Sequence, residues 1–329
     1  MTNIEIFIDL VSRSQTILLT THIYPDADGI GSQIALCLAL RKMGKKAICV
    51  NQYNLPERYS YLDSDECVVD TKEFNKTKMM KDIDLAIITD TNSLMRVGVE
   101  VEKLVTRAEN ILFVDHHPCP KELSALHCIN TKMAATAELV TLLINALGVS
   151  LNKDIALPLY TGIIIDTSSF RYPTVTANTH LVVSQLMQTG ITPSYAYNMV
   201  YGTKKISHVR LLGKILSQSQ TDRHEEIAWL TILEKDLKEY QVDAEDTNAF
   251  INHLLILDNV KVACTFREIK GGMIKISLRS TLDEIDVGVM AQALGGGGHN
   301  HSAATLIEGE IEKVVAMTIE KISKMLKTY

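Results

Sequence analysis

The sequence predicts an α/β fold: an N-terminal domain built on a doubly wound, mainly parallel sheet, and a smaller C-terminal α+β domain, joined by a helical linker. Three observations lead to this prediction. The 329 residues exceed what one hydrophobic core usually serves. In the first half, short apolar runs alternate with helix-patterned segments, as buried parallel strands and their crossovers do. Toward the C-terminus, β-rich runs surround a glycine pair that is typical of a hairpin turn.

Four apolar runs in the first half each end in polar residues and predict strands. They are 16–22, 46–51, 84–90 and 110–117. Helices are expected at 29–43, 134–147 and 153–165, the first because Ile30, Ile34 and Leu38 share one face. Polar residues therefore gather at the carboxyl ends of the strands, where open α/β sheets place their sites.

The pattern changes after residue 166. A helix is expected at 176–190, followed by a mostly helical connector to about 220. Two β-rich runs flank Gly271 and Gly272; a helix at 286–294, four glycines, a strand at 303–308 and a helix at 310–327 complete the chain. We therefore expect a catalytic domain over 1–190, a helical linker over 191–222 and a substrate-binding domain over 223–329.

Composition and charge exclude several classes of protein. With a net charge of −6 and 5% aromatic residues, the chain lacks the basic, stacking surface that grips long nucleic acid, so we expect no long duplex partner. No apolar run is long enough to span a membrane, and the N-terminus does not resemble a signal peptide. None of the six cysteines forms a CxxC pair, which favours reduced, structural thiols. We expect a cytoplasmic protein without a membrane partner.

Acids and histidines recur beside the predicted strands. They are His22, Asp26, Asp28, Asp90, Asp115, His116, His117 and Asp166. A lone aspartate at such a position is more often a helix cap, and adjacent histidines alone are weak evidence. The carboxylates of Asp26, Asp28, Asp90 and Asp166 would repel one another, however, if they converged at one sheet edge. Two divalent cations would cancel their negative charge. Imidazole with carboxylate oxygen suits Mn²⁺ first, with Mg²⁺, Co²⁺ or Zn²⁺ as alternatives, and Asp90 could bridge ions roughly 3.5–4 Å apart.

The set from His22-x-x-Pro25-Asp26-x-Asp28 through Asp115-His116-His117 resembles the DHH phosphoesterase superfamily. The run of four glycines followed by His299 resembles the glycine loop of the DHH-associated domain in its RecJ and nano-RNase branches. The resemblance implies one metal held by His22, Asp26 and Asp90, and a second held by Asp28, Asp90, His116 and Asp166. It also implies that His117 donates to the substrate phosphate and that Asp115 orients an imidazole.

The glycine loop and one arginine are the candidate substrate-binding residues. The N–H groups of Gly296, Gly297 and Gly298 could approach an anion closely, His299 could donate to it, and Arg279 resembles the family's phosphate clamp. A sharp turn and a surface arginine are the alternatives. The chain departs from the family pattern at Ala304 and at Ser168, where glycine is common. Arg96 and Arg171 also resemble positions near the site, with surface or structural roles as alternatives.

These features predict a two-metal hydrolase that cuts short oligoribonucleotides (nano-RNA) to mononucleotides and converts pAp to AMP. The alternative is a phosphodiesterase for cyclic di-AMP or pApA. A non-catalytic nucleotide-binding module is disfavoured because every metal position carries a ligand. A pyrophosphatase or exopolyphosphatase is disfavoured by the glycine loop. The oligomeric state is left open, with a homodimer as one alternative.

Overall fold

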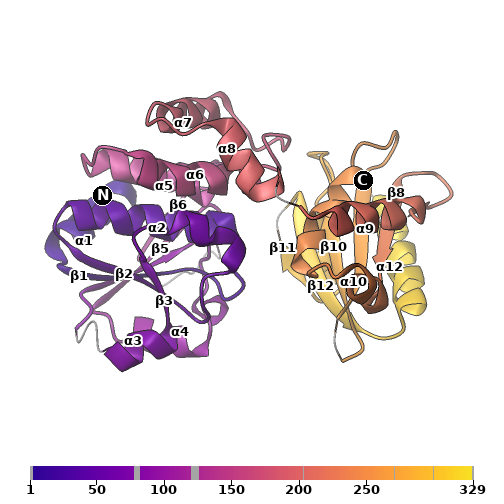
Figure 1. Ribbon diagram of the computed structural model, residues 1–329, viewed down its shortest axis with the longest axis horizontal. Helices are drawn as coiled ribbons and strands as arrows, with labels where there is room; N and C mark the ends of the chain where they lie inside the picture. Colours follow the sequence, from indigo (N-terminus) through magenta and orange to yellow (C-terminus); the bar gives the residue numbers. More distant parts are fainter. Residues whose placement is uncertain are drawn as a thin grey trace. The chain divides into compact units, whose positions relative to one another are not determined.

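The computed structural model describes residues 3–77, 82–119, 126–202, 204–269, 271–298 and 300–327. The chain divides into two compact units, Met1–Gly202 and Thr203–Tyr329, each with its own sheet (Figure 1). The division falls inside the segment expected as a linker; the limits of that linker stay a prediction. Among these residues, no helix is long and apolar enough to cross a membrane.

In the described part of unit 1, six parallel strands form one sheet in the order β3-β2-β1-β4-β5-β6. The strands are β1 (Thr16–Thr20), β2 (Lys46–Asn51), β3 (Val68–Asp70), β4 (Leu85–Thr89), β5 (Asn110–Asp115) and β6 (Leu126–Ile129). The strand order reverses between β1 and β4, which is the switch point where such sheets place their sites. The predicted doubly wound parallel sheet is confirmed.

Helices cover both faces of this sheet (Figure 1). The longer ones are α1 (Asn3–Arg13), α2 (Ala27–Lys42), α5 (Thr136–Ala146), α6 (Lys153–Asp166) and α7 (Ala177–Met187); the shorter ones are α3 (Thr71–Thr77), α4 (Val99–Val105) and α8 (Pro193–Tyr197). Successive strand residues point to opposite faces. Leu19 accordingly packs with α2, α5 and α6, whereas Leu18 packs with α3 and α4.

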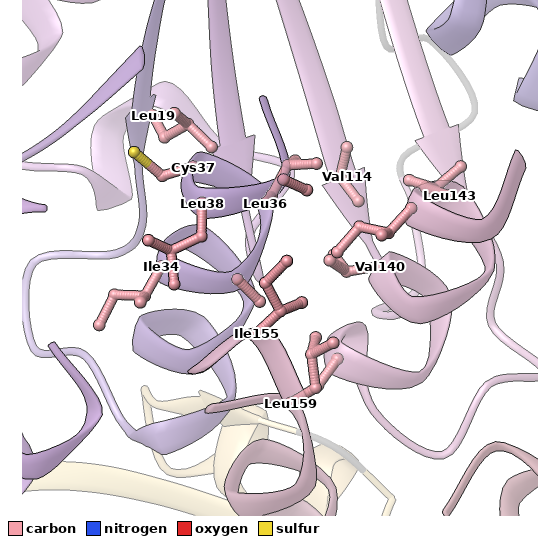
Figure 2. Packing of buried hydrophobic residues seen from close by; sticks show 14 of the residues in the cluster. Leu19, Ile34, Leu36, Cys37, Leu38, Val114, Val140, Leu143, Ile155 and Leu159 are labelled. Atoms are coloured by element: carbon pink, nitrogen blue, oxygen red, sulfur yellow. The ribbon is translucent and has the colours of Figure 1, made fainter. Parts of the chain in front are cut away.

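The larger core of unit 1 is built between the sheet and three helices. Figure 2 shows Leu19 and Val114 of the sheet facing residues Ile34 and Leu38 of α2, Val140 and Leu143 of α5, and Ile155 and Leu159 of α6. Helix α2 is buried over nearly all of its length, and its apolar residues are accordingly not confined to one face.

Two glycines allow α2 and α6 to pack closely. A Cβ atom on Gly31 would lie 2.3 Å from the carbonyl oxygen of Pro158, and one on Gly162 would lie 2.9 Å from Oδ1 of Asp28. Only glycine fits at such approaches. The close packing brings the C-terminal end of α6, where Asp166 lies, toward the first turn of α2.

In the described part of unit 2, six strands form a mixed sheet in the order β11-β12-β10-β9-β8-β7. The strands are β7 (Gln220–Thr221), β8 (Ile227–Ile232), β9 (Val262–Ile269), β10 (Met273–Arg279), β11 (Gly297–Gly298) and β12 (Ser302–Glu308). The helices are α9 (Ile206–Ser217), α10 (Glu234–Tyr240), α11 (Val287–Ala293) and α12 (Ile311–Leu326). Among the described strands of this second sheet, only β8 and β9 pair in parallel. The predicted α+β architecture is confirmed, including the β9–β10 hairpin.

Candidate metal centre

The loop after β1 places three candidate ligands at the start of α2. Oδ1 of Asp26 accepts hydrogen bonds from the backbone N–H of Asp28 at 2.9 Å and of Gly29 at 3.2 Å. Asp26 is therefore a helix N-cap, as the alternative interpretation held. The cap also fixes this carboxylate beside His22. Asp26 and His22 belong to one of the ligand clusters described below.

Asp90 follows β4 and turns the chain into the site. Its φ of 61° lies in the left-handed region, which aspartate tolerates better than most residues and which ends the strand at Thr89. The side chain is 3% exposed, and its Oδ2 lies 3.4 Å from Nε2 of His22.

The Asp-His-His run follows β5 and is held by its own first residue. Oδ1 of Asp115 accepts hydrogen bonds from the backbone N–H of His116 (2.8 Å) and of His117 (3.1 Å), and from Nδ1 of His117 (2.6 Å). Asp115 is completely buried. The structure therefore places this carboxylate against an imidazole and against the turn that follows the strand.

His116 points its Nε2 atom at the carboxylates. Its Nδ1 lies 3.2 Å from the carbonyl oxygen of Met133, which can only accept, so the neutral ring carries its proton on Nδ1. Nε2 is then the atom that can bind a cation. It lies 3.2 Å from Oδ2 of Asp166, 3.9 Å from Oδ1 of Asp90 and 4.0 Å from Oδ2 of Asp28.

Among the described residues, three clusters place ligand atoms within 4.8 Å of one another and could hold metal ions. They are His22–Asp26–Asp90, Asp28–His116–Asp166 and Asp90–His116–His117. All six predicted metal ligands belong to these clusters, and Asp90 and His116 each belong to two. A donor set of imidazole nitrogen and carboxylate oxygen fits divalent transition metals.

The electrostatics of the site favour cations. Burial raises the pKa of Asp28 to about 6. Burial and the neighbouring Asp28 and Asp26 carboxylates raise the pKa of Asp90 well above its usual value. Burial opposes protonation of His116, but Asp166 and Asp28 outweigh it and raise the pKa of this ring. Divalent cations would relieve this repulsion by replacing the protons that these groups otherwise hold.

His117 differs from the expectation of a phosphate donor. Burial lowers the pKa of His117, which favours the neutral ring. Since Nδ1–H of the neutral ring donates its hydrogen bond to Asp115, Nε2 carries a lone pair and accepts rather than donates. A donor role for His117 therefore requires the protonated imidazolium, and its place in a metal cluster offers a second role.

A strained turn follows Asp166 at the end of α6. Ser168, Ser169 and Phe170 have φ values of 49°, 63° and 64°, all in the left-handed region. This conformation explains why glycine suits position 168. Arg171 donates from Nε to the Ser168 carbonyl at 3.1 Å and from Nη2 to the Ser168 hydroxyl at 2.9 Å, so it supports the turn.

The start of α5 contacts the candidate ligands, although its sequence carries no motif that predicts this. The backbone N–H groups of Thr136 and Ala137 donate to the two carboxylate oxygens of Asp28 at 2.7 and 2.8 Å. The Thr136 hydroxyl donates to Oδ1 of Asp90 at 3.0 Å. The expected helix over 134–147 gave no sign of these contacts, because they depend on how distant segments meet.

In unit 2 the predicted substrate-binding residues lie near one end of the sheet. Arg279 ends β10 opposite Ser302 of β12, and Gly298 of β11 pairs with Ala303, which also belongs to β12. The Gly296 N–H donates to the carbonyl of Ala291 at 2.8 Å and so closes the end of α11. His299 lies outside the described residues.

His301 connects the two candidate substrate-binding segments. Its Nδ1 lies 3.1 Å from the carbonyl oxygen of Ser280, the residue after Arg279, and its Nε2 lies 3.5 Å from Oδ1 of Asp283. The ring is 5% exposed. It therefore ties the chain that follows the glycines to the chain that follows β10.

Comparison with known proteins identifies both units. The N-terminal domain model of the DHH family matches residues 16–163, and the DHHA1 domain model matches residues 226–328. A protein of Mycoplasma genitalium, "Uncharacterized protein MG371", is 30% identical over 93% of this chain and 90% of its own length. The chain belongs to the DHH family. The prediction of a DHH phosphoesterase with a DHH-associated domain is thereby confirmed.

Two further proteins are similar to this chain over nearly their full length. The "Bifunctional oligoribonuclease and PAP phosphatase NrnA" of Thermus thermophilus is 28% identical over 94% of this chain and 90% of its own. A crystal structure of an "exopolyphosphatase-related protein" from Bacteroides fragilis superposes with a TM-score of 0.88 at 25% identity, covering 99% of this chain and 96% of that one.

Proposed function

We propose that this chain hydrolyses short oligoribonucleotides to mononucleotides and removes the 3′-phosphate of pAp, with two divalent cations, preferentially Mn²⁺. The observation that carries the proposal is the sharing of Asp90 between two clusters of candidate metal ligands. A relative of nearly the same length is named an oligoribonuclease and PAP phosphatase, which supports the substrate class.

Each candidate side chain of the metal centre would have its own role. His22, Asp26 and Asp90 would hold one cation, and Asp28, Asp90, His116 and Asp166 the other. When bound, such cations lower the pKa of a water molecule and offset charge on phosphoryl oxygens. Asp115 keeps the His117 ring oriented, and His117 contacts either the phosphate or a cation from Nε2.

Arg279 and the glycine loop would hold a phosphate of the substrate. A guanidinium can make two parallel hydrogen bonds to phosphate, and Gly298, with φ of 146°, gives the backbone a shape that side chains rarely allow. Arg279 and the glycine loop would therefore favour a substrate that carries a second phosphate or sugar, such as pAp or a dinucleotide.

A substrate panel with Mn²⁺ tests the proposal. The panel compares pApA, longer oligoribonucleotides, pAp, cyclic di-AMP and pyrophosphate, with products resolved over time. We expect turnover of di- to tetranucleotides and of pAp, and slow or no turnover of longer strands. Preferential turnover of cyclic di-AMP or pyrophosphate would overturn the substrate assignment, and activity that persists in excess chelator would overturn the metal requirement.

A further inference from the structure

The segment that leads into α5 touches the metal centre at several points. The Met133 carbonyl meets Nδ1 of His116, the N–H groups of Thr136 and Ala137 meet Asp28, and the Thr136 hydroxyl meets Asp90. None of these four groups belongs to a candidate ligand. Together they contact Asp28, Asp90 and His116, and each of the three clusters contains at least one of these residues.

Asp28 is held as an anion would be at a helix N-terminus. Each of its carboxylate oxygens accepts one N–H from the first turn of α5, which is 11 residues long. Unpaired N–H groups and the helix dipole both favour negative charge at this end. The contact fixes the plane of the Asp28 carboxylate, and it uses backbone atoms that a substitution does not remove.

The Thr136 hydroxyl is the side-chain part of this arrangement. It is completely buried and donates to Oδ1 of Asp90 at 3.0 Å, while Oδ2 of the same carboxylate faces His22. Metal binding requires the ionised form of Asp90, which only accepts hydrogen bonds, so in that form the hydroxyl must donate and its orientation is determined. The bond therefore sets which Asp90 oxygen faces which cluster.

Glu138 holds the segment itself in place. Its Oε2 accepts from the Ala134 N–H at 2.8 Å and from the Thr179 hydroxyl at 3.2 Å. Thr179 belongs to the first turn of α7, where it shares a capping box with Thr176. The loop before α5 is thus tied to a second helix that carries no candidate ligand.

We propose that Thr136 is a positioning residue: its hydroxyl orients Asp90 so that the carboxylate serves both metal clusters. This inference rests on the two-metal assignment of the proposed function. Partners of this kind, one step behind the ligands, typically change metal affinity or activity roughly 10–100-fold when removed.

The test compares Thr136→Val, Thr136→Ser and Thr141→Val with the wild type. Valine keeps the shape of threonine and removes the hydroxyl, whereas serine keeps the hydroxyl. Thr141 is a matched control, because it is also completely buried in α5 and its hydroxyl donates to the Ala137 carbonyl at 2.8 Å. Mn²⁺ binding to the substrate-free protein is measured by calorimetry, and the melting temperature is measured with and without Mn²⁺.

We expect Thr136→Val to weaken Mn²⁺ binding about tenfold or more and to shrink the rise in melting temperature on adding Mn²⁺. Thr136→Ser and Thr141→Val should bind Mn²⁺ like the wild type. Wild-type affinity in Thr136→Val, or equal losses in all three variants, would overturn the inference while leaving the proposed function standing. A wild-type protein that binds no divalent cation would overturn both.

Discussion

Oδ2 of Asp90 lies 3.4 Å from Nε2 of His22, although the two residues follow different strands. The strands β1 and β4 are neighbours at the switch point of the sheet, so their carboxyl ends open into the same crevice. The left-handed backbone of Asp90 turns the chain immediately after β4 and ends the strand there. Asp90 therefore belongs both to the cluster with His22 and Asp26 and to the cluster with His116 and His117.

Asp90→Asn should abolish turnover, because an amide cannot bridge two cations as a carboxylate does. Asp84→Asn is the matched control at the other end of β4: its Oδ2 accepts from the N–H groups of Gln15 and Thr16 at 2.6 and 2.8 Å, far from any candidate ligand. It should cost about 1 kcal/mol of stability with little loss of activity. Initial rates and Mn²⁺ stoichiometry check both; wild-type turnover by Asp90→Asn would refute the bridging role.

The stability of the metal-free protein should fall as pH rises through about 6. The pKa of Asp28 is raised from 3.8 to about 6 by burial. The folded state therefore keeps a proton that the unfolded state has already lost at a lower pH. The stabilising effect of this proton is full below pH 3.8 and is lost above about 6. Mn²⁺ needs the ionised carboxylate, so the rise in melting temperature on adding Mn²⁺ should grow between pH 5 and 7.5. A rise independent of pH would contradict this linkage.

Gly298→Ala should damage the glycine loop, whereas Gly297→Ala should be tolerated. A Cβ on Gly298 would lie 2.4 Å from Cα of Ala303, and its φ of 146° is strained for any side chain; a Cβ on Gly297 meets nothing within 4 Å. The strain should cost about 1–3 kcal/mol. We expect a lower melting temperature and a higher KM for pAp in Gly298→Ala only, with unchanged Mn²⁺ affinity. Equal effects of the two variants would show that the loop shape does not matter.

Arg279→Ala should weaken substrate binding and leave metal binding unchanged. Loss of charge-assisted hydrogen bonds to phosphate is expected to raise KM about tenfold or more. Arg279→Lys keeps the charge but not the two-pronged geometry, so it should fall between alanine and wild type. Steady-state kinetics with pAp and calorimetry with Mn²⁺ separate the two effects. A drop in Mn²⁺ affinity with constant KM would place Arg279 outside the substrate site.

The candidate metal ligands could be singled out from the sequence because most of them follow apolar strands, and the carboxyl ends of parallel strands meet at one edge of a sheet. The strand limits were less accurate for physical reasons. The strand expected over 110–117 ends at Asp115, because the carboxylate of Asp115 accepts hydrogen bonds from the next two backbone N–H groups. Asp166 ends a helix, and its approach to His116 depends on the glycine contact between α2 and α6.

Two other elements were not predicted, for different reasons. Helix α1 has its buried Phe7, Leu10 and Val11 at helical spacing, so its pattern was present in the sequence and was not used. Strand β6 has four residues at the edge of the sheet and one buried side chain, which is too little pattern to predict a strand. The role of Thr136 was equally hidden, since a threonine at a helix start most often serves the helix itself. Its partner Asp90 follows β4, far away in the sequence, and only the packed fold brings the two together.

The glycine contact between α2 and α6 has a consequence for how mutational tolerance maps onto this protein. Neither Gly31 nor Gly162 bears a functional group, yet any larger residue at either position would wedge the two helices apart and carry Asp166 away from Asp28. In a saturation screen scored by enzymatic turnover, these two glycines should stand out as strongly as the acids. A screen scored by protein abundance would help to separate them, because replacing an acid mainly removes a ligand, whereas replacing either glycine disrupts the core.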